Sequence, residues 1–528
     1  MENISSPAKL VSVAEMIAIE QQADQNGFTY AMMMENAGLN LAKIVDRDYQ
    51  ELKPGMVLGL VGSGNNGGDT LVALDYLGQW GWKTGAYIAR PRPKDDLLVK
   101  RVVETGSGLF DGDQDHNYSQ LLTLLSDCSI VLDGVLGTGI QLPLHGHVGD
   151  ILSHAAQILS QLDPSPIAVA VDCPSGVDCD TGEAAPQCIQ ADLTITMGGI
   201  KQGLYKFPAN NYVGNLKMVG IGLPGDLTAL PSIRRFVVDE SYVIEHLPQR
   251  GANAHKGTFG TALIIAGSVN YPGAALLAGQ AAYRAGAGLV TLAVPRSLHS
   301  ALAGHFQEGT WLPLPEEEGA IAESAAAVIL DNLQRSTALL IGPGFGLASG
   351  TKNFIYKLLK SKFPQYQNKL VIDADGLKLL AALEGWNHLI PVESVLTPHP
   401  GEMSILTGIS TQEIQRNRVE VAEKYAHDWG HTVVLKGAFT VIAAPNGDTC
   451  VVPIASAALA RAGTGDVLAG LITGLLAEGM GAFTAAACGA WIHGKAGLRA
   501  ASVIGSTASV LSGDILHGIV DVMADVSD

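Results

Sequence analysis

The stretch 61–81, VGSGNNGGDTLVALDYLGQWG, contains a glycine-rich loop whose spacing is typical of nucleotide binding. Gly62, Gly64 and Gly67 fit the pattern G-x-G-x-x-G. The apolar run 56–61 precedes the loop and a helical pattern of leucines follows it, which is the context that a dinucleotide-binding fingerprint requires. The loop therefore predicts a bound nucleotide, held either as a redox cofactor or in some other role.

The residues around this loop fit a redox cofactor poorly. A dinucleotide fold places an acidic residue at the end of its second strand, and this chain has Arg90 and Arg92 there, which would suit a 2′-phosphate. Asp69 falls at the start of the following helix, where a carboxylate caps the helix and repels a phosphate. Asn65 and Asn66 offer amide oxygens to a hard cation. A plain glycine-rich turn with an N-capping aspartate and an ordinary cofactor site both stay open here.

Two more polar loops follow apolar runs in the first half. Asp133 ends one run ahead of a Gly-Thr-Gly turn, and Asp172 ends another, shortly before Ser175. Any one of these aspartates alone would most often be a turn or capping residue. Because ligands of parallel sheets gather outside the carboxyl ends of strands, we expect these three side chains and Asn66 to form one oxygen-rich site.

The segment 461–479, RAGTGDVLAGLITGLLAEG, predicts a different chemistry in the second half. Gly463 and Gly465 flank Thr464, and a helical pattern follows Asp466. The free N–H groups of such a loop at a helix start form an anion hole. Asp466 is placed to take a proton from a hydroxyl while a phosphoryl group arrives, as in the G-T-G-D loop of ribokinase-like folds. The alternative is a capped helix after a flexible turn.

Other polar residues of the second half also follow apolar runs. His399 lies between prolines, which fix its loop position. Lys436 ends another run, where it would hold a phosphate or simply lie at a surface turn. Asp373 and Asp375 end a third run, and either would help to hold Mg²⁺ through water. With the glycine-rich stretch 342–346, these residues predict a nucleotide site.

A parallel sheet in each half would bring these residues together. Short apolar runs rich in valine and isoleucine alternate with helical patterns, which is typical of parallel strands buried on both faces. The runs lie at 56–61, 85–89, 129–135, 167–172, 193–197, 261–267, 289–294, 338–342, 370–375, 394–397, 432–437 and 440–445. We predict an α/β protein, with an N-terminal Rossmann-like three-layer sandwich followed by a C-terminal ribokinase-like α/β domain. The seam is expected near the Pro- and Gly-bearing stretch 222–240.

Composition argues against several functional classes. The chain has 528 residues, too many for one core, so at least two domains are expected. Its formal net charge of −18, without a Lys/Arg-rich run, argues against nucleic acid and anionic membranes as partners. The six cysteines include no C-x-x-C pair, and no apolar segment reaches the roughly 18 residues of a membrane span. We expect a cytoplasmic protein, a homo-oligomer, that acts on small molecules.

The first half resembles the NAD(P)H-hydrate epimerase family. The resemblance rests on MMENAG at 33–38, GNNGGD at 64–69, DGVLGTG at 133–139 and DCPSGVD at 172–178. It implies that the nucleotide is the substrate, a hydrated NADH or NADPH with a hydroxyl on carbon 6 of the nicotinamide ring. The enzyme would interconvert the R and S epimers at that carbon.

The resemblance also implies roles for particular residues. Asp172 would be the acid/base, since losing and regaining a hydroxyl needs a carboxyl within hydrogen-bond reach. The implied potassium ligands are Asn66, Asp133 and Ser175. The implied substrate contacts are Asn65, Asn66, Gly67, Gly68, Asp69, Gly137, Thr138, Gly139, Ile140, Gln141, Leu142, Pro143 and Asp172. The chain departs from the family's motifs at Thr70 and Gly134, where glycine and alanine are usual.

From about residue 250 to the end, the chain resembles the ADP/ATP-dependent NAD(P)H-hydrate dehydratase family. The motifs that carry this resemblance lie at 256–288, 342–346, 397–406, 435–442 and 461–479. It implies that the nucleotide, with Mg²⁺, phosphorylates the 6-hydroxyl of the S epimer, with Asp466 as the base, and that phosphate then leaves. The implied substrate contacts are Ala274, Gly344, His399 and Asp466, and the implied nucleotide contacts are Lys436, Gly437, Ala438, Phe439, Thr440 and Gly465.

Together the two resemblances predict one bifunctional repair enzyme. Its epimerase domain would span 1–225, a linker 226–245, and its dehydratase domain 246–528. Fused chains resemble prokaryotic members of the family, so ADP, giving AMP and phosphate, is the expected phosphoryl donor. The alternatives are a vitamin-type small-molecule kinase fused to a nucleotide-binding domain, whose product stays phosphorylated, and a nucleotide-binding sensor without turnover.

Overall fold

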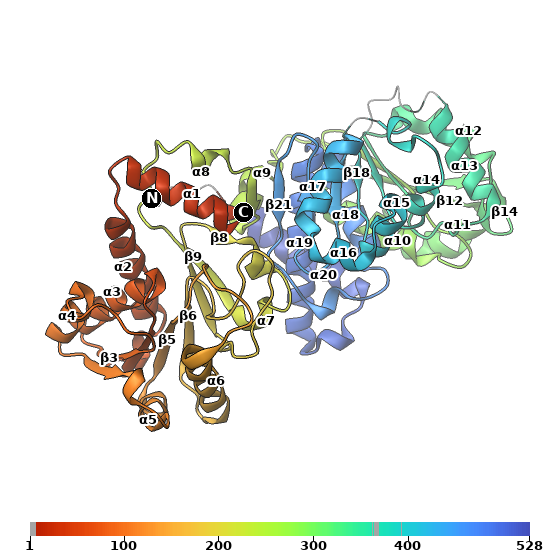
Figure 1. Ribbon diagram of the computed structural model, residues 1–528. Helices are drawn as coiled ribbons and strands as arrows, with labels where there is room; N and C mark the ends of the chain where they lie inside the picture. Colours follow the sequence, from red (N-terminus) through yellow and green to blue (C-terminus); the bar gives the residue numbers. More distant parts are fainter. Residues whose placement is uncertain (1–6, 362, 364–368, 392, 528) are drawn as a thin grey trace. The chain divides into compact units, whose positions relative to one another are not determined.

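The computed structural model describes residues 7–361, 363, 369–391 and 393–527, which form two compact units (Figure 1). One unit spans Ala8–Ile233, and the other begins at Arg234. The segment 226–245, expected as a linker, is divided between them. Helix α8 (Ala229–Ser232) ends the first unit, whereas strand β10 (Arg235–Val237) and helix α9 (Glu240–His246) open the second.

The first unit is built on a seven-stranded sheet whose strand pairs are all parallel. Across the sheet the strands are β4 (Gly108–Asp111), β3 (Lys83–Ile88), β2 (Met56–Val61), β5 (Ile130–Gly134), β6 (Ile167–Val171), β7 (Leu193–Met197) and β9 (Asn215–Val219). In chain order this is the 3-2-1-4-5-6 arrangement of a dinucleotide fold with one strand added, so the Rossmann-like prediction is confirmed. The order reverses between β2 and β5, and the loops that follow these strands open a crevice there.

Helices cover both faces of this sheet. They are α1 (Val13–Gln25), α2 (Tyr30–Asp48), α3 (Asn65–Gln79), α4 (Leu97–Glu104), α5 (Ser119–Asp127), α6 (Gly146–Gln161) and α7 (Asn210–Val213). Alternate residues of β2 point to opposite faces, so Val57 packs with helices α1–α4 and Leu58 with α5 and α6. A separate pair of short parallel strands, β1 (Leu10–Val11) and β8 (Ile200–Lys201), places Lys201 beneath the crevice.

The second unit has a ten-stranded sheet. Across it lie β10, β21 (Thr449–Val451), β20 (Val441–Ala443), β19 (Thr432–Leu435), β18 (Val395–Leu396), β17 (Lys369–Ile372), β16 (Ala338–Ile341), β11 (Thr261–Ile265), β12 (Leu289–Pro295) and β13 (Thr310–Leu314). A separate hairpin joins β14 (Glu316–Glu317) to β15 (Ala320–Ile321). The pairs β19–β20 and β20–β21 are antiparallel and the other pairs of the large sheet are parallel, so the prediction of a parallel strand at 440–445 is wrong. Residues 440 and 441 follow β19 too closely for a crossover helix, and the chain can only turn back.

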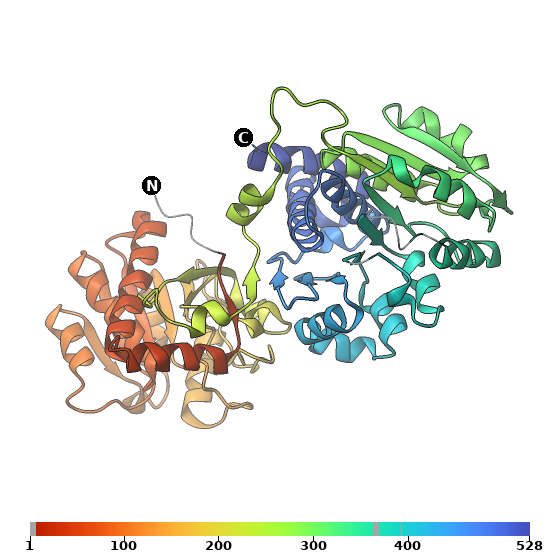
Figure 2. The same ribbon diagram turned by 90° about the horizontal axis from the view of Figure 1, so that it is seen from above.

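Helices also cover both faces of the second sheet. On one face lie α9, α10 (Gly273–Arg284), α11 (Arg296–Leu302), α18 (Thr464–Ala477), α19 (Ala482–Ile504) and α20 (Ser512–Ser527), the last three packed side by side in Figure 2. The remaining helices are α12 (Ala325–Asn332), α13 (Ser349–Lys360), α14 (Asp375–Ala381), α15 (Pro400–Thr407), α16 (Thr411–Arg416) and α17 (Arg418–Trp429). Helices α12–α14 pack on the opposite face. Within the described part of the chain, no helix combines the length and apolarity needed to cross a membrane.

Candidate active sites

The glycine-rich loop after β2 brings α3 very close to the sheet. The helix begins at Asn65, and its N-cap is Gly64, which makes no side-chain capping hydrogen bond. A Cβ on Gly62 would lie 1.9 Å from a carbonyl oxygen of the loop after β5, and one on Gly67 would lie 2.1 Å from the carbonyl oxygen of Gly62. The interpretation of Asp69 as an N-capping residue is wrong, because Asp69 lies one turn inside the helix and is buried.

The expected oxygen-rich cluster does form at the crevice. Ser175 donates to Asp133 twice, from Oγ to Oδ1 at 2.5 Å and from its backbone N–H to Oδ2 at 2.8 Å. Asn66 Nδ2 donates to the carbonyl oxygens of Val171 at 2.6 Å and Leu136 at 3.2 Å. Burial raises the pKa of Asp133 although hydrogen bonds from Ser175 oppose the shift, and Asp133 forms no ion pair within the described residues. The cluster therefore contains a buried carboxyl without a compensating charge.

Asp172 forms a second polar group at the end of β6. Its backbone is left-handed, with φ of 65°, and its Oδ1 accepts hydrogen bonds from Thr196 Oγ1 at 3.1 Å, from the Met197 N–H at 3.0 Å and from Lys201 Nζ. Lys201 is only 2 % exposed. Burial would lower the pKa of its ammonium group, but the charge of Asp172 and the hydrogen bond to it outweigh burial and raise the pKa. Asp172 is thus held by a buried ion pair that sequence reasoning missed.

Two hollows open onto these groups. The larger, of about 740 Å³, is lined by the loop 63–67 and the turn 135–141. The smaller, of about 100 Å³, is lined by Asp69, Asp172 and Lys201. Residues common to both linings are Glu20, Asn65, Asn66 and Thr138. The two hollows therefore join the predicted substrate loops to the buried carboxyls.

Two of the predicted substrate contacts lie outside these linings. Gly68 faces α2, where a Cβ would come within 2.6 Å of Met34 Sδ. Leu142 packs against a small apolar cluster behind the site, while its neighbour Pro143 lines the larger hollow. The two arginines after β3 also differ in their surroundings. Arg90 lines the larger hollow, whereas Arg92 donates to the Gly62 carbonyl oxygen at 2.7 Å and to Asp96.

In the second unit, the G-T-G-D loop leads directly into α18. The helix begins at Thr464, and its N-cap Gly463 has a φ of 88°, a conformation that favours glycine. Asp466 lies in the first turn. Burial raises its pKa from 3.8 to about 7, and the charge of Asp373 adds to the rise, whereas the charge of Lys436 lowers it. A carboxyl that titrates near neutrality at a helix N-terminus is suited to proton abstraction.

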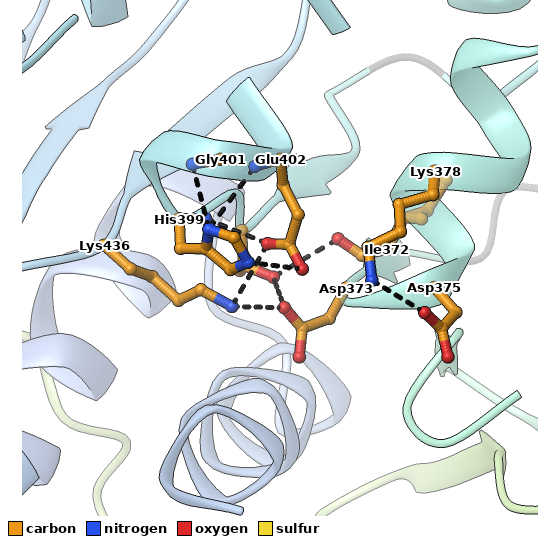
Figure 3. A network of polar contacts seen from close by, with 9 residues as sticks. Ile372, Asp373, Asp375, Lys378, His399, Gly401, Glu402 and Lys436 are labelled. Atoms are coloured by element: carbon orange, nitrogen blue, oxygen red, sulfur yellow. Dashed lines mark hydrogen bonds and ion pairs between the residues drawn. The ribbon is translucent and has the colours of Figure 1, made fainter. Parts of the chain in front are cut away.

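Lys436 lies between Asp373, just after β17, and Glu402 of α15 (Figure 3). Its Nζ lies 2.6 Å from Asp373 Oδ1 and 3.8 Å from Glu402 Oε2. A Cβ on Gly465 would lie 3.4 Å from the same Nζ, so the lysine borders the G-T-G-D loop. Asp373 also accepts a hydrogen bond from Thr397 Oγ1 at 2.7 Å. Lys436 and Gly465, both predicted nucleotide contacts, therefore lie together.

His399 is the N-cap of α15 (Figure 3). Its Nδ1 accepts hydrogen bonds from the backbone N–H groups of Gly401 and Glu402, at 3.0 and 3.3 Å, and Glu402 Oε2 accepts one from the His399 N–H at 2.9 Å. This capping box fixes the imidazole and leaves half of its side chain exposed. Burial would raise the pKa of Glu402, but the hydrogen bonds from His399 and the charge of Lys436 lower it instead.

The remaining predicted substrate contacts meet between β11 and β16, where the strand order reverses. Gly344 has a φ of 66°, and a Cβ there would lie 2.8 Å from the Ala274 side chain. The neighbouring Gly346 N–H donates to Asp375 Oδ2 at 2.9 Å, and Asp375 is paired with Lys378 at 2.9 Å. Ala274 and Gly344 are therefore at the topological switch point of the second sheet, where ligands of such folds bind.

Models of two protein families match the two halves of the chain. Residues 262–520 match NAD(P)H-hydrate dehydratase, and residues 30–203 match the YjeF-related protein N-terminus. The bifunctional NAD(P)H-hydrate repair enzyme Nnr of Moorella thermoacetica is 35 % identical, with 98 % of this chain and 97 % of that protein covered. The chain belongs to the bifunctional NAD(P)H-hydrate repair enzymes.

Further relatives of this repair enzyme have the same description. The Nnr protein of Thermofilum pendens is 33 % identical, with 93 % of this chain and 91 % of that protein covered. Among solved structures, the ADP/ATP-dependent NAD(P)H-hydrate dehydratase of Bacillus subtilis, co-crystallised with ATP and Mg²⁺, is 31 % identical with a TM-score of 0.47. The match covers 55 % of this chain and 98 % of the Bacillus subtilis chain.

The repair enzyme has both NAD(P)H-hydrate epimerase and NAD(P)H-hydrate dehydratase activity. Its C-terminal unit is an α/β domain on a mostly parallel sheet, as the sequence predicts, and it matches the dehydratase family model. The kinase alternative is not favoured, because curated relatives matched over nearly the whole chain are repair enzymes. For the same reason the sensor interpretation is not favoured.

The two departures from the epimerase motifs compensate each other in the repair enzyme. Thr70 Oγ1 donates to the Asn66 carbonyl oxygen at 2.7 Å, and a Cβ on Gly134 would lie 1.9 Å from that Oγ1. We expect Gly134→Ala to lower the free energy of unfolding by about 1–3 kcal/mol, the usual cost of overpacking a core. In a Thr70→Gly background, most of this cost should disappear, as denaturant titration of the four variants will show. Additive effects would contradict the proposed coupling.

Proposed function

We propose that the second unit activates the 6-hydroxyl of S-NAD(P)H hydrate through Asp466, and that the first unit converts the R epimer into S at the site around Asp172. The observation that supports this most strongly is Asp466 itself. It is a carboxyl with a pKa of about 7 in the first turn of α18, beside a glycine loop that borders Lys436. No other arrangement in the second unit combines a proton acceptor with a phosphate-binding loop among the described residues.

The dehydration then has two steps. Asp466 takes the proton of the 6-hydroxyl while the hydroxyl oxygen attacks the terminal phosphorus of the nucleotide. When ADP is the donor, AMP is the leaving group. In the second step the carbon–oxygen bond breaks, inorganic phosphate departs with the electron pair, and loss of a proton from carbon 5 restores the double bond. The test is recovery of dihydronicotinamide absorbance when hydrated NADH meets Mg²⁺ and ADP or ATP. A phosphorylated organic product would instead indicate a kinase.

The nucleotide site would lie between Lys436–Thr440 and the G-T-G-D loop. Gly437 has a φ of 149° and Phe439 a φ of 55°, so this turn is tightly bent, and Thr440 Oγ1 donates to the Gly437 carbonyl oxygen at 3.0 Å. Among the described residues, no group of three His, Cys, Asp or Glu side chains could hold a metal ion. Mg²⁺ would therefore reach the site mainly with the phosphates, with Asp373 as its water-mediated contact, since Asp373 Oδ2 accepts no hydrogen bond from the described residues.

The pH dependence follows from the state that Asp466 needs. A general base must be ionised, so kcat/KM for the S hydrate should rise about tenfold per pH unit up to about pH 7 and level off above it. Asp373→Asn removes a negative charge that raises the pKa of Asp466, and its acid limb should move to lower pH. Initial rates from pH 5 to 9 will measure both limbs. A plateau that already begins near pH 4–5 in the unmodified enzyme would contradict a raised pKa for Asp466.

In the first unit, we propose a potassium ion at Asn66, Asp133 and Ser175. The fit is supported by the buried Asp133 carboxyl, which has hydrogen bonds from Ser175 but no cationic partner in the described residues. The carbonyl oxygens of Leu136 and Val171 lie beside Asn66, so the available donors are oxygens, which suit a hard cation. A bound K⁺ would supply the missing charge and fix the loops that surround the substrate.

Removing the Asp133 carboxylate should weaken binding of the potassium ion and slow epimerisation. We expect Asp133→Ala to reduce the epimerisation rate on the order of 10-fold to 100-fold, the range found when a metal site loses a supporting group. Dehydration of the S epimer should stay at the level of the unmodified enzyme, because Asp133 belongs to the other unit. Potassium titrations of both activities provide the measurement. Equal epimerisation rates in K⁺ and in K⁺-free Li⁺ buffer would exclude a required ion.

We further propose a cytoplasmic homo-oligomer. All six cysteines are free and buried, as expected in a reducing compartment. Exposed apolar side chains gather where α19 ends and α20 begins, at Val503, Ile504 and Leu511, and such groups favour protein contacts. Light scattering of the purified chain would give its assembly state.

A further inference from the structure

Asp69 is a buried carboxyl that lines the smaller hollow. It lies on α3, is 7 % exposed, and forms no hydrogen bond or ion pair with the described residues. Asp75, on the same helix, shows the usual arrangement, since it is 2 % exposed and accepts a hydrogen bond from Arg101 Nε at 2.9 Å. Leaving a buried polar group unpaired costs stability, so an unpaired carboxyl at position 69 indicates a functional role.

The free side of Asp69 is the hollow of about 100 Å³ that also reaches Asp172 and Lys201. Glu20 from α1 and Tyr30 from α2 complete the titratable groups that line it. Burial raises the pKa of Asp69 well above its usual value, the negative charges of Asp172 and Glu20 add to the rise, and only Lys201 opposes it. Asp172, in contrast, is in an ion pair with Lys201. Two carboxyls at one cavity are therefore in opposite environments, which is how paired acids and bases are built.

We propose that Asp69 donates the proton and Asp172 accepts it during epimerisation, an inference that rests on the proposed placement of the epimerase reaction at this site. Lys201 is then a positioning residue, which holds the Asp172 carboxyl in place through their ion pair. The start of α3, Asn65–Asp69, would thus have a chemical role in addition to the proposed substrate contact.

The bond changes at carbon 6 balance with these two groups. The carbon–oxygen bond breaks with its electron pair going to oxygen, Asp69 supplies a proton, and water forms while the ring nitrogen lone pair makes a carbon–nitrogen double bond. Water then adds to the other face of the ring, the ring nitrogen regains its lone pair, and Asp172 takes the proton of that water. Transfer of the proton from Asp172 to Asp69 through the hollow they share resets the site.

The test compares Asp69→Asn with Asp75→Asn in the full chain. Chromatography of R- and S-NADH hydrate, with K⁺ and without nucleotide, gives the epimerisation rate above the uncatalysed background. We expect Asp69→Asn to lower kcat about 10²–10⁴-fold, the usual effect of losing a general acid, with KM nearly unchanged. Asp75→Asn, which removes a buried carboxyl of the same helix outside the hollow, should stay within about threefold of that rate. S-specific dehydration by the same samples reports the amount of active second unit, and limited proteolysis reports whether the first unit stays folded.

A pH profile separates an acid from a merely structural residue. The unmodified enzyme should lose activity as alkaline pH deprotonates Asp69, and Asp69→Asn should lack that limb. Normal epimerisation by Asp69→Asn beside a slow Asp172→Asn would overturn the donor role and leave the site in place. Normal rates for both variants would overturn the site itself, and a slow Asp69→Asn with a normal Asp172→Asn would overturn the pairing. If Asp69→Asn fails to fold, Asp69→Glu, which keeps the acid, should epimerise with the alkaline limb retained, and loss of that limb would overturn the proposal.

Discussion

Asp466→Asn is expected to lower the rate of S-NAD(P)H-hydrate dehydration about 10²–10⁴-fold, the range for a general base. Asparagine has nearly the same shape but cannot take a proton, and the residue lies in the first turn of α18 beside the nucleotide loop. The fold should persist, because no hydrogen bond within the described residues depends on the Asp466 carboxyl. Initial rates with saturating Mg²⁺ and ADP provide the measurement.

Two controls define that result. Asp521→Asn, an exposed carboxyl of α20 near Arg499, should leave the dehydration rate unchanged. Epimerisation by Asp466→Asn should also be normal, because that reaction belongs to the other unit, and calorimetry should show retained nucleotide binding. Near-normal dehydration by Asp466→Asn would remove this residue from the mechanism.

The second large effect is expected when the units are separated at Arg234. The second unit alone should dehydrate S-NADH hydrate and leave R to accumulate, and adding residues 1–233 as a separate chain should restore clearance of R. Each unit has its own sheet and its own apolar core, so each has what independent folding requires. The cut falls before β10, whose pairing partner β21 stays in the same piece.

Rates for both epimers, followed by chromatography, test this division of work. Clearance of both epimers by the second unit alone would mean that the first unit does something other than epimerise. Insolubility of the second unit, with solubility restored only by coexpression of the first, would show that the units depend on each other for folding.

The positions of the predicted strands along the chain followed directly from the sequence. Parallel strands buried on both faces give continuous apolar runs, and each predicted run lies on a strand of one of the two sheets. The direction of β20 was predicted wrongly, because the short connection after β19 sets it and the apolar run alone does not. Residues 226–245 were assigned to a linker, and β10 within them was missed because it has only three residues and its pairing with β21 spans over 200 positions of the chain.

The candidate sites were predictable where their residues lie in short sequence motifs that follow strands. The cluster of Asn66, Asp133 and Ser175 formed because glycine-rich loops after neighbouring strands must meet at one edge. Lys201 was missed because β8 pairs with β1, a contact between strands of two residues each that no periodicity reveals. Its signal is a lone lysine in the glycine-rich stretch 196–203. That Asp69 is unpaired is a property of three-dimensional packing, which the sequence does not contain.

The central claim, that one chain repairs both epimers by phosphorylation and loss of phosphate, is tested most directly by following R- and S-NADH hydrate together. The full chain is incubated with an equal mixture of the two epimers, K⁺, Mg²⁺ and ADP, and both epimers, NADH and inorganic phosphate are measured over time. The account predicts that S falls first, that R then falls to completion, and that one inorganic phosphate appears for each NADH formed. Persistence of R, or phosphate that stays on an organic product, would contradict it.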